Sequence, residues 1–216
     1  MVEAFFSPKK VESMRPQIQK TVDQLLDAMM KKGGSNPIDL VENFSLPIPS
    51  YIIYGILGVP LSDLAYLTQC NAIRSNGSAT AAEASGANKE LLSYIAGLVD
   101  QRLAEPREDL ISSLVVEQVA PGHIEKADAV QIAFLLLVAG NATMINMINL
   151  GVVTLFENPD QLKDLKSDPS LTKAFVEELC RYHTASGMAM RRVAKVDIEL
   201  QGKVRPSDFS SVASLT

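Results

Sequence analysis

The longest uncharged stretch of the chain constrains its fold more than any other feature. No Asp, Glu, Lys or Arg lies between Asp128 and Glu157, and only Gly140 and Gly151 weaken a helix within it. Because no proline or turn signal interrupts the stretch, the pattern predicts one helix over about 125–157, about nine turns long. A helix of this length and composition either spans a membrane or forms the buried axis of a large helical domain.

Polar residues in this helix favour the buried axis over the membrane span. The helix carries the amides Gln131, Asn141, Asn146 and Asn149, and neither basic clusters nor Trp or Tyr flank it. A buried amide needs a hydrogen-bond partner, because leaving it unpaired costs about 1–3 kcal/mol. We therefore expect a ligand or a water-filled cavity beside Asn141 and Thr143 to supply partners.

Apolar periodicity predicts further helices on both sides of this axis. The expected helices lie over 8–33, 39–58, 62–73, 81–104 and 108–119, with two short ones opening at Pro159 and Ser170. Pro47 and Pro49 are expected to kink or split the second helix. Alternating residues over 192–203, with Gly202 in a turn, predict a hairpin. The expected fold class is therefore mainly α with a short C-terminal β-hairpin.

Charge and cysteine usage exclude several functional classes. The chain of 216 residues has 20 basic and 25 acidic side chains and a net charge of −5. This balance offers no basic surface for nucleic acid and no polybasic run for an anionic membrane. Cys70 and Cys180 lie far apart with no CxxC pattern, which argues against structural zinc and a disulfide scaffold. No secretory signal is visible, so we expect an intracellular location, cytoplasmic or mitochondrial.

Two short patterns follow one another in a fixed order along the chain. Ala-Gly-Asn-Ala-Thr occupies 139–143 in the long helix, and Glu-Leu-Cys-Arg follows at 178–181. In this order the two patterns resemble those of the cytochrome P-450 family. Supporting stretches lie at 39–60, 102–114, 158–162 and 192–202. The resemblance implies a partial cytochrome P-450 domain over 1–205, with central helices around the long distal helix, and a divergent Ser-rich tail over 206–216.

Within that family, the chain resembles the fungal nitric oxide reductase type most closely. The resemblance is carried by Ala-Gly-Asn-Ala-Thr-Met at 139–144 and by 177–186. Monooxygenase members usually carry an acid just before the threonine, whereas Ala142 cannot relay a proton. The resemblance implies reduction of nitric oxide to nitrous oxide with electrons taken directly from NADH or NADPH, without a separate reductase. Two alternatives remain: a monooxygenase acting on an organic substrate, and a non-catalytic helical fragment or interaction protein.

The resemblance assigns roles to residues of the long helix. Ala139 and Gly140 would let the helix approach haem b closely, and Thr143 would orient a water or the nicotinamide in catalysis. Each role has a structural alternative. Gly140 also suits a helix–helix crossing, and the Thr143 hydroxyl can bond the carbonyl four residues back.

Further roles fall on residues after the long helix. Glu178 and Arg181 match the buried structural ion pair of the family, although such i,i+3 pairs are also common on solvated helix faces. Arg192 matches the residue that pairs with a haem propionate, and Arg191 would add charge toward a dinucleotide phosphate. Strand alternation places these two arginines on opposite faces. Ser186 is placed beside the nicotinamide, with a catalytic role.

The family holds haem iron by a thiolate in a loop that this sequence does not contain. Neither Cys70 nor Cys180 matches the ligand position, so no metal ligand is assigned. His123 and His183 are interpreted as surface or capping residues. We expect a truncated gene product or gene model, incompetent in catalysis by itself.

Overall fold

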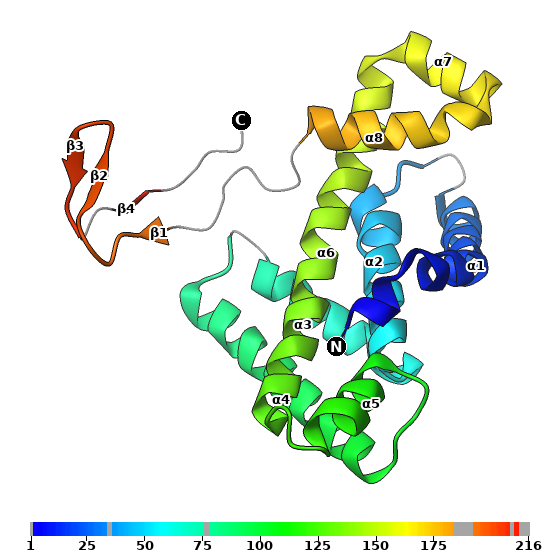
Figure 1. Cartoon of the computed structure of the whole chain (residues 1–216). Helices are drawn as coiled ribbons and strands as arrows, with labels where there is room; N and C mark the ends of the chain where they lie inside the picture. The colour runs from blue at the N-terminus through cyan, green and yellow to red at the C-terminus, as the bar shows by residue number, and fades with distance from the viewer. Residues whose placement is uncertain (1, 34–35, 76–77, 184–191, 208–209, 212–216) are drawn as a thin grey trace. The chain divides into compact units, whose positions relative to one another are not determined.

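The computed structural model forms two compact units, Met1–Asn149 and Leu150–Thr216, and the division falls within the helix α6 (Lys126–Glu157). Figure 1 shows the chain as a set of helices followed by short strands. The structure describes residues 2–33, 36–75, 78–183, 192–207 and 210–211.

Helices make up the first unit, as the periodicity predicts. In chain order they are η1 (Glu3–Phe6), α1 (Pro8–Gly33), η2 (Val41–Ser45), α2 (Pro47–Leu57), η3 (Leu61–Asp63), α3 (Leu64–Ser75), α4 (Ala81–Ala104), α5 (Leu110–Leu114), η4 (Val115–Val119) and the first part of α6. The expected split near Pro47 is confirmed, because the π-helical turn η2 ends just before α2 begins.

Local hydrogen bonds explain where several helices begin. The Ser7 hydroxyl accepts from the Lys10 amide at 3.3 Å at the start of α1. Thr80 and Glu83 form a reciprocal capping box on α4. Ser62 lies within η3, just before α3, where its hydroxyl donates to Asp63 Oδ1.

The core of the first unit joins α2, α3, α4, α5 and α6. Its largest fully buried apolar side chains are Tyr54, Leu57, Leu67, Leu91, Ile95, Leu110, Ile111 and Leu137. Burying each of these side chains contributes about 1.5–3 kcal/mol relative to leaving it in water. The core therefore fixes the inner face of α6 against α2.

A buried ion pair closes one end of this core. The Arg102 Nε donates to Asp109 Oδ2 at 2.6 Å, and the two side chains are 2% and 4% exposed. The same guanidinium donates to the Gly58 carbonyl at 2.7 Å. Gly58 ends α2 in the left-handed region, at φ 78°, and a Cβ there would meet the Asp109 carboxylate. A side chain at this position would collide with the ion pair.

Within the first unit, α6 is buried on one face and exposed on the other. Ala129, Ala133 and Leu137 are fully buried, whereas Leu135 is 62% exposed. The expected buried axis holds for the inner face of α6, whereas among the described residues nothing covers its outer face. In the part of the chain that the structure describes, α6 is also the one helix long and apolar enough to cross a membrane, with 17% of its most apolar window buried.

The second unit follows α6 with short helices and strands. They are α7 (Pro159–Ser167), η5 (Pro169–Leu171), α8 (Thr172–Tyr182), β1 (Arg192–Val193), β2 (Ile198–Leu200), β3 (Lys203–Arg205) and β4 (Ser210–Ser211). The predicted hairpin is confirmed: β2 pairs antiparallel with β3 across Gln201 and Gly202, both at positive φ. The tail was expected to lack periodic structure, yet β4 pairs antiparallel with β1.

Candidate functional site

The candidate site is the segment Ala139–Thr143 in the middle of α6. Ala139 and Thr143, one helical turn apart, are both exposed, on the same face as the exposed Leu135. Asn141 points the other way and is fully buried. The segment thus separates an outward, small-residue face from an inward polar anchor.

Asn141 finds its hydrogen-bond partners within the protein. Its Nδ2 donates to the Leu137 carbonyl at 3.0 Å, and its Oδ1 accepts from the Ser50 hydroxyl at 2.9 Å. Near the end of the first unit, Asn149 Oδ1 accepts from the Ser45 hydroxyl at 2.6 Å. The expectation that a ligand or water would satisfy Asn141 is therefore wrong, because the Leu137 carbonyl and the Ser50 hydroxyl pair with its two polar atoms.

Sequence reasoning missed Ser45 and Ser50 as partners of α6. Both are fully buried, and Ser50 lies 91 positions from Asn141. No periodicity or motif relates residues so far apart. The one available signal was the presence of amides in an otherwise apolar helix, which requires polar partners somewhere in the core.

The Thr143 hydroxyl makes the bond of its structural alternative. It donates to the Ala139 carbonyl at 3.1 Å, while the side chain remains exposed. A hydroxyl rotates about a single bond, so it can exchange this contact for a ligand at small cost. Its catalytic role stays a prediction.

Gly140 lies between the two faces, toward α2. A Cβ built on it would come 3.6 Å from the Ile53 side chain, an ordinary van der Waals distance. This position matches the helix–helix crossing that was the alternative interpretation. Close approach to a macrocycle stays a prediction for Gly140, and the exposed Ala139 is the position with an open outer side.

Glu178 and Arg181 form a bidentate pair on the surface of α8 in the second unit. Arg181 Nε and Nη2 donate to the two Glu178 oxygens at 2.7 and 2.6 Å. The side chains are 59% and 69% exposed. Hydrogen bonding to Arg181 lowers the pKa of Glu178. The pair exists as predicted, but in this chain it lies on a solvated face.

The remaining predicted site residues lie largely outside the described part of the chain. Ser186 and Arg191 fall outside it. Arg192 is described by its backbone, which pairs with Ser211 between β1 and β4. The roles of these three residues stay predictions. Of the two histidines, His183 bonds Thr154 through Nε2 at 2.7 Å, consistent with a capping residue after α8.

Neither cysteine belongs to a cluster of metal-ligating side chains among the described residues. Cys70 is 4% exposed, and its Sγ lies 3.4 Å from Glu90 Oε2. Burial, followed by the hydrogen bond to Glu90, raises the pKa of this thiol, which disfavours the thiolate that binds metals. Cys180 is exposed on α8. Within the described ranges, no three His, Cys, Asp or Glu side chains gather into a metal site.

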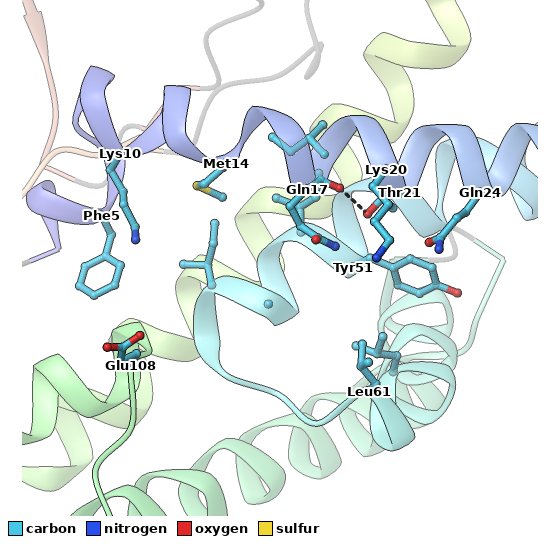
Figure 2. Close-up of a pocket in the computed structure, with 15 residues that line it drawn as sticks. Phe5, Lys10, Met14, Gln17, Lys20, Thr21, Gln24, Tyr51, Leu61 and Glu108 are labelled. Carbon is cyan, nitrogen blue, oxygen red and sulfur yellow. Dashed lines mark hydrogen bonds between the residues drawn. The ribbon is translucent and has the colours of Figure 1, made fainter.

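A cavity of about 680 Å³ lies elsewhere in the first unit, between α1 and α2. Figure 2 shows Lys10, Lys20 and Tyr51 around it, with the Thr21 hydroxyl donating to the Gln17 carbonyl. None of the predicted site residues lines this cavity. It therefore belongs to the packing of α1 on α2 and is separate from the candidate site.

Comparisons with known proteins point to one family. The chain is 64% identical over 214 residues to cytochrome P450 55A3 of Fusarium lichenicola, covering 99% of this chain and 52% of that protein. Pentalenic acid synthase of Streptomyces avermitilis is 39% identical over 208 residues, covering 96% of this chain and 51% of the synthase. No family model matches the chain. The chain spans about half the length of the relatives that it matches.

Solved structures agree with the sequence comparison. The mycinamicin VIII C21 methyl hydroxylase of Micromonospora griseorubida matches with a TM-score of 0.86 at 32% identity, over 98% of this chain and 53% of the hydroxylase. Cytochrome P450 MoxA of Nonomuraea recticatena matches with a TM-score of 0.83 at 36% identity, over 98% of this chain and 52% of MoxA.

Proposed function

Because the chain belongs by homology to the cytochrome P-450 family, we propose that it supplies the distal half of a haem-thiolate oxidoreductase of the nitric oxide reductase type. The proposed reaction reduces nitric oxide to nitrous oxide with electrons taken directly from NADH or NADPH. The observation that carries it is Ala142, which stands in α6 where monooxygenases usually carry an acid. Identity of 64% to one relative, against 39% to a synthase named for an organic product, supports the same branch.

The described residues fit the distal side of a haem. The exposed face of α6 carries Leu135, Ala139 and Thr143, and no charged residue lies near them on the helix. This face is uncharged, and Ala139 at its centre has a small side chain, which would allow a flat apolar macrocycle to approach the helix. Bound haem with a thiolate ligand would supply iron for nitric oxide binding and electron transfer. Neither described cysteine suits that ligand, so a segment outside this chain would provide the thiolate.

The residues of this chain would then position substrate and electron donor. Ala139 would keep the outer side of α6 open, and Thr143 would turn its hydroxyl from the Ala139 carbonyl toward a water or the nicotinamide. Arg192 would hold a propionate, and Arg191 a phosphate of the dinucleotide. Ser186 would hydrogen-bond beside the nicotinamide.

A chimaera tests this proposal. The matched 214 residues of the Fusarium lichenicola relative are replaced by this chain, so that the relative supplies the remaining half. We expect a thiolate-type carbon monoxide difference spectrum and NADH- or NADPH-driven consumption of nitric oxide. A normal spectrum without turnover would overturn the reductase assignment and favour a monooxygenase. The 216-residue chain alone, mixed with haem, should give no thiolate-type band.

A further inference from the structure

The buried Asn141 can fix the rotation of α6 in a way that apolar packing cannot. The buried face of α6 is mostly Ala, Val and Leu, whose contacts depend little on direction. Such a face can rotate about the helix axis at modest cost. A hydrogen bond depends steeply on distance and angle, so a buried one selects a single rotation. A lone buried Asn fixes register between coiled-coil helices by the same principle.

The donors and acceptors around Asn141 can all be paired in only one way. Its Nδ2 donates to Leu137, so its Oδ1 faces the Ser50 hydroxyl. That hydroxyl also lies 2.9 Å from the Leu46 carbonyl, but it carries one proton. Leu46 precedes the first turn of α2, where its carbonyl accepts a backbone amide in any case. The proton therefore goes to Asn141, which otherwise has a buried oxygen without a donor.

We propose that Asn141 is a positioning residue: its hydrogen bond to Ser50 fixes the rotation of α6 so that Ala139 and Thr143 face away from α2. The Ser45–Asn149 bond lies eight residues further along α6, near the end of the first unit. A shift of one residue in this rotation turns α6 by about 100°. Such a turn would bury Thr143 or move it off the outward face. The catalytic meaning of that face rests on the proposed function, whereas the rotation itself does not.

Thiol labelling of the 216-residue chain measures the rotation directly. In a Cys180→Ser background, Leu135→Cys reports the outward face and Val130→Cys the buried face, since these positions are 62% and 8% exposed. The measured quantity is the labelling rate of Leu135→Cys divided by that of Val130→Cys. We expect Asn141→Leu to lower this ratio about five- to tenfold, the factor that corresponds to one net hydrogen bond.

Asn141→Leu keeps the volume and leaves no buried polar atom unpaired, because the Ser50 hydroxyl can return to the Leu46 carbonyl. Its unfolding midpoint should therefore move less than that of Ser50→Ala, which orphans the Asn141 oxygen. Ser50→Thr keeps a hydroxyl and should therefore keep the labelling ratio of the parent chain. Ser112→Ala is the matched control, because Ser112 is a buried serine that bonds Arg107 and no residue of α6.

The same variants are then placed in the chimaera. We expect Asn141→Leu to raise the KM for NADH or NADPH while the carbon monoxide spectrum stays unchanged, and Ser50→Thr to retain the parent KM. An unchanged labelling ratio in folded Asn141→Leu would overturn the positioning role. If the parent chimaera consumes no nitric oxide, the proposed function fails, and the labelling ratio still decides the rotation.

Discussion

Replacing Asp109 by Asn removes the negative charge of the buried ion pair, while Asn keeps the volume and one acceptor oxygen. In the native chain, Asp109 Oδ1 accepts from that amide at 2.7 Å, while Oδ2 accepts from Arg102. Removing one partner of a buried pair costs about 3–5 kcal/mol, since the other charge stays buried. The single Asn oxygen can accept from Arg102 or from the Ser112 amide, and the Asn NH₂ group then faces the other donor. The hydrogen bond that remains, worth about 1 kcal/mol, is therefore offset by the donor left unpaired. We expect a loss of about 3–5 kcal/mol in the free energy of unfolding.

A second substitution separates charge from packing. Adding Arg102→Met to Asp109→Asn removes the stranded cation and leaves the Gly58 carbonyl without its donor. An orphaned buried acceptor costs about 1–3 kcal/mol, which is less than a stranded buried charge. The double variant should therefore be more stable than Asp109→Asn alone, although it carries one more change.

Urea unfolding followed by far-ultraviolet circular dichroism measures these differences. With a slope of about 2 kcal/mol per molar urea, the middle of the usual range, Asp109→Asn should lower the midpoint by about 1.5–2.5 M. Glu12→Gln is the control, because the Glu12–Arg15 pair has similar geometry but is 66% and 73% exposed, and its loss should be undetectable. If the double variant is less stable than Asp109→Asn by the full cost of Arg102→Met alone, the stranded-charge reasoning is refuted.

Three further predictions test other parts of the structure. Gly58→Ala should lower the urea midpoint, because a left-handed backbone costs about 1–2 kcal/mol for a residue with a Cβ, and that Cβ would meet Asp109; an unchanged midpoint would contradict it. Among the described residues, no well-formed hydrogen bond reaches the buried Tyr54 hydroxyl, so Tyr54→Phe should leave stability at pH 7 unchanged or raise it by about 1 kcal/mol, whereas a clear loss would reveal a hydrogen bond to Thr68 or Ser50. Burial raises the pKa of Tyr54 from 10.0 to about 12, so the hydroxyl ionises first in the unfolded chain and stability falls as the pH rises from 10 toward 12; urea titrations at these pH values should show a smaller loss in Tyr54→Phe. In the chimaera, Ala142→Asp should slow NADH- or NADPH-driven nitric oxide consumption, and unchanged turnover would remove Ala142 from the functional argument.

The helices could be predicted from the sequence because their causes are local. The start of α4 is set by Thr80 and Glu83, and the end of α2 by Gly58, all within a few residues of the boundary. The hairpin around Gly202 is equally local. The pairing of β4 with β1 joins residues almost twenty positions apart, and no pattern within the tail announces it. Elements formed by distant partners are those that the sequence did not reveal.

The features of the candidate site also divide into those with local causes and those that depend on distant partners. The motif around Thr143 could be recognised from five consecutive residues, and the Glu178–Arg181 pair from helical spacing. The partner of Asn141 could not, because Ser50 meets it through the tertiary packing of α2 on α6. The exposure of the outer face of α6 could not be predicted either, because the sequence of an uncharged helix does not show whether one face or both faces are covered.

The uncharged stretch of α6 is explained by two different demands on its two faces. The inner face excludes charge because an ion buried against α2 would lose its hydration without a partner. It tolerates Asn141 because a serine completes its hydrogen bonds. The outer face has no such constraint within this chain, where Leu135 and Ala139 meet solvent. Exposed apolar surface of this kind marks a binding site or an aggregation liability. Its uncharged character therefore points to a partner outside this chain, and the proposed haem is an occupant that matches both its small central residues and its lack of charge.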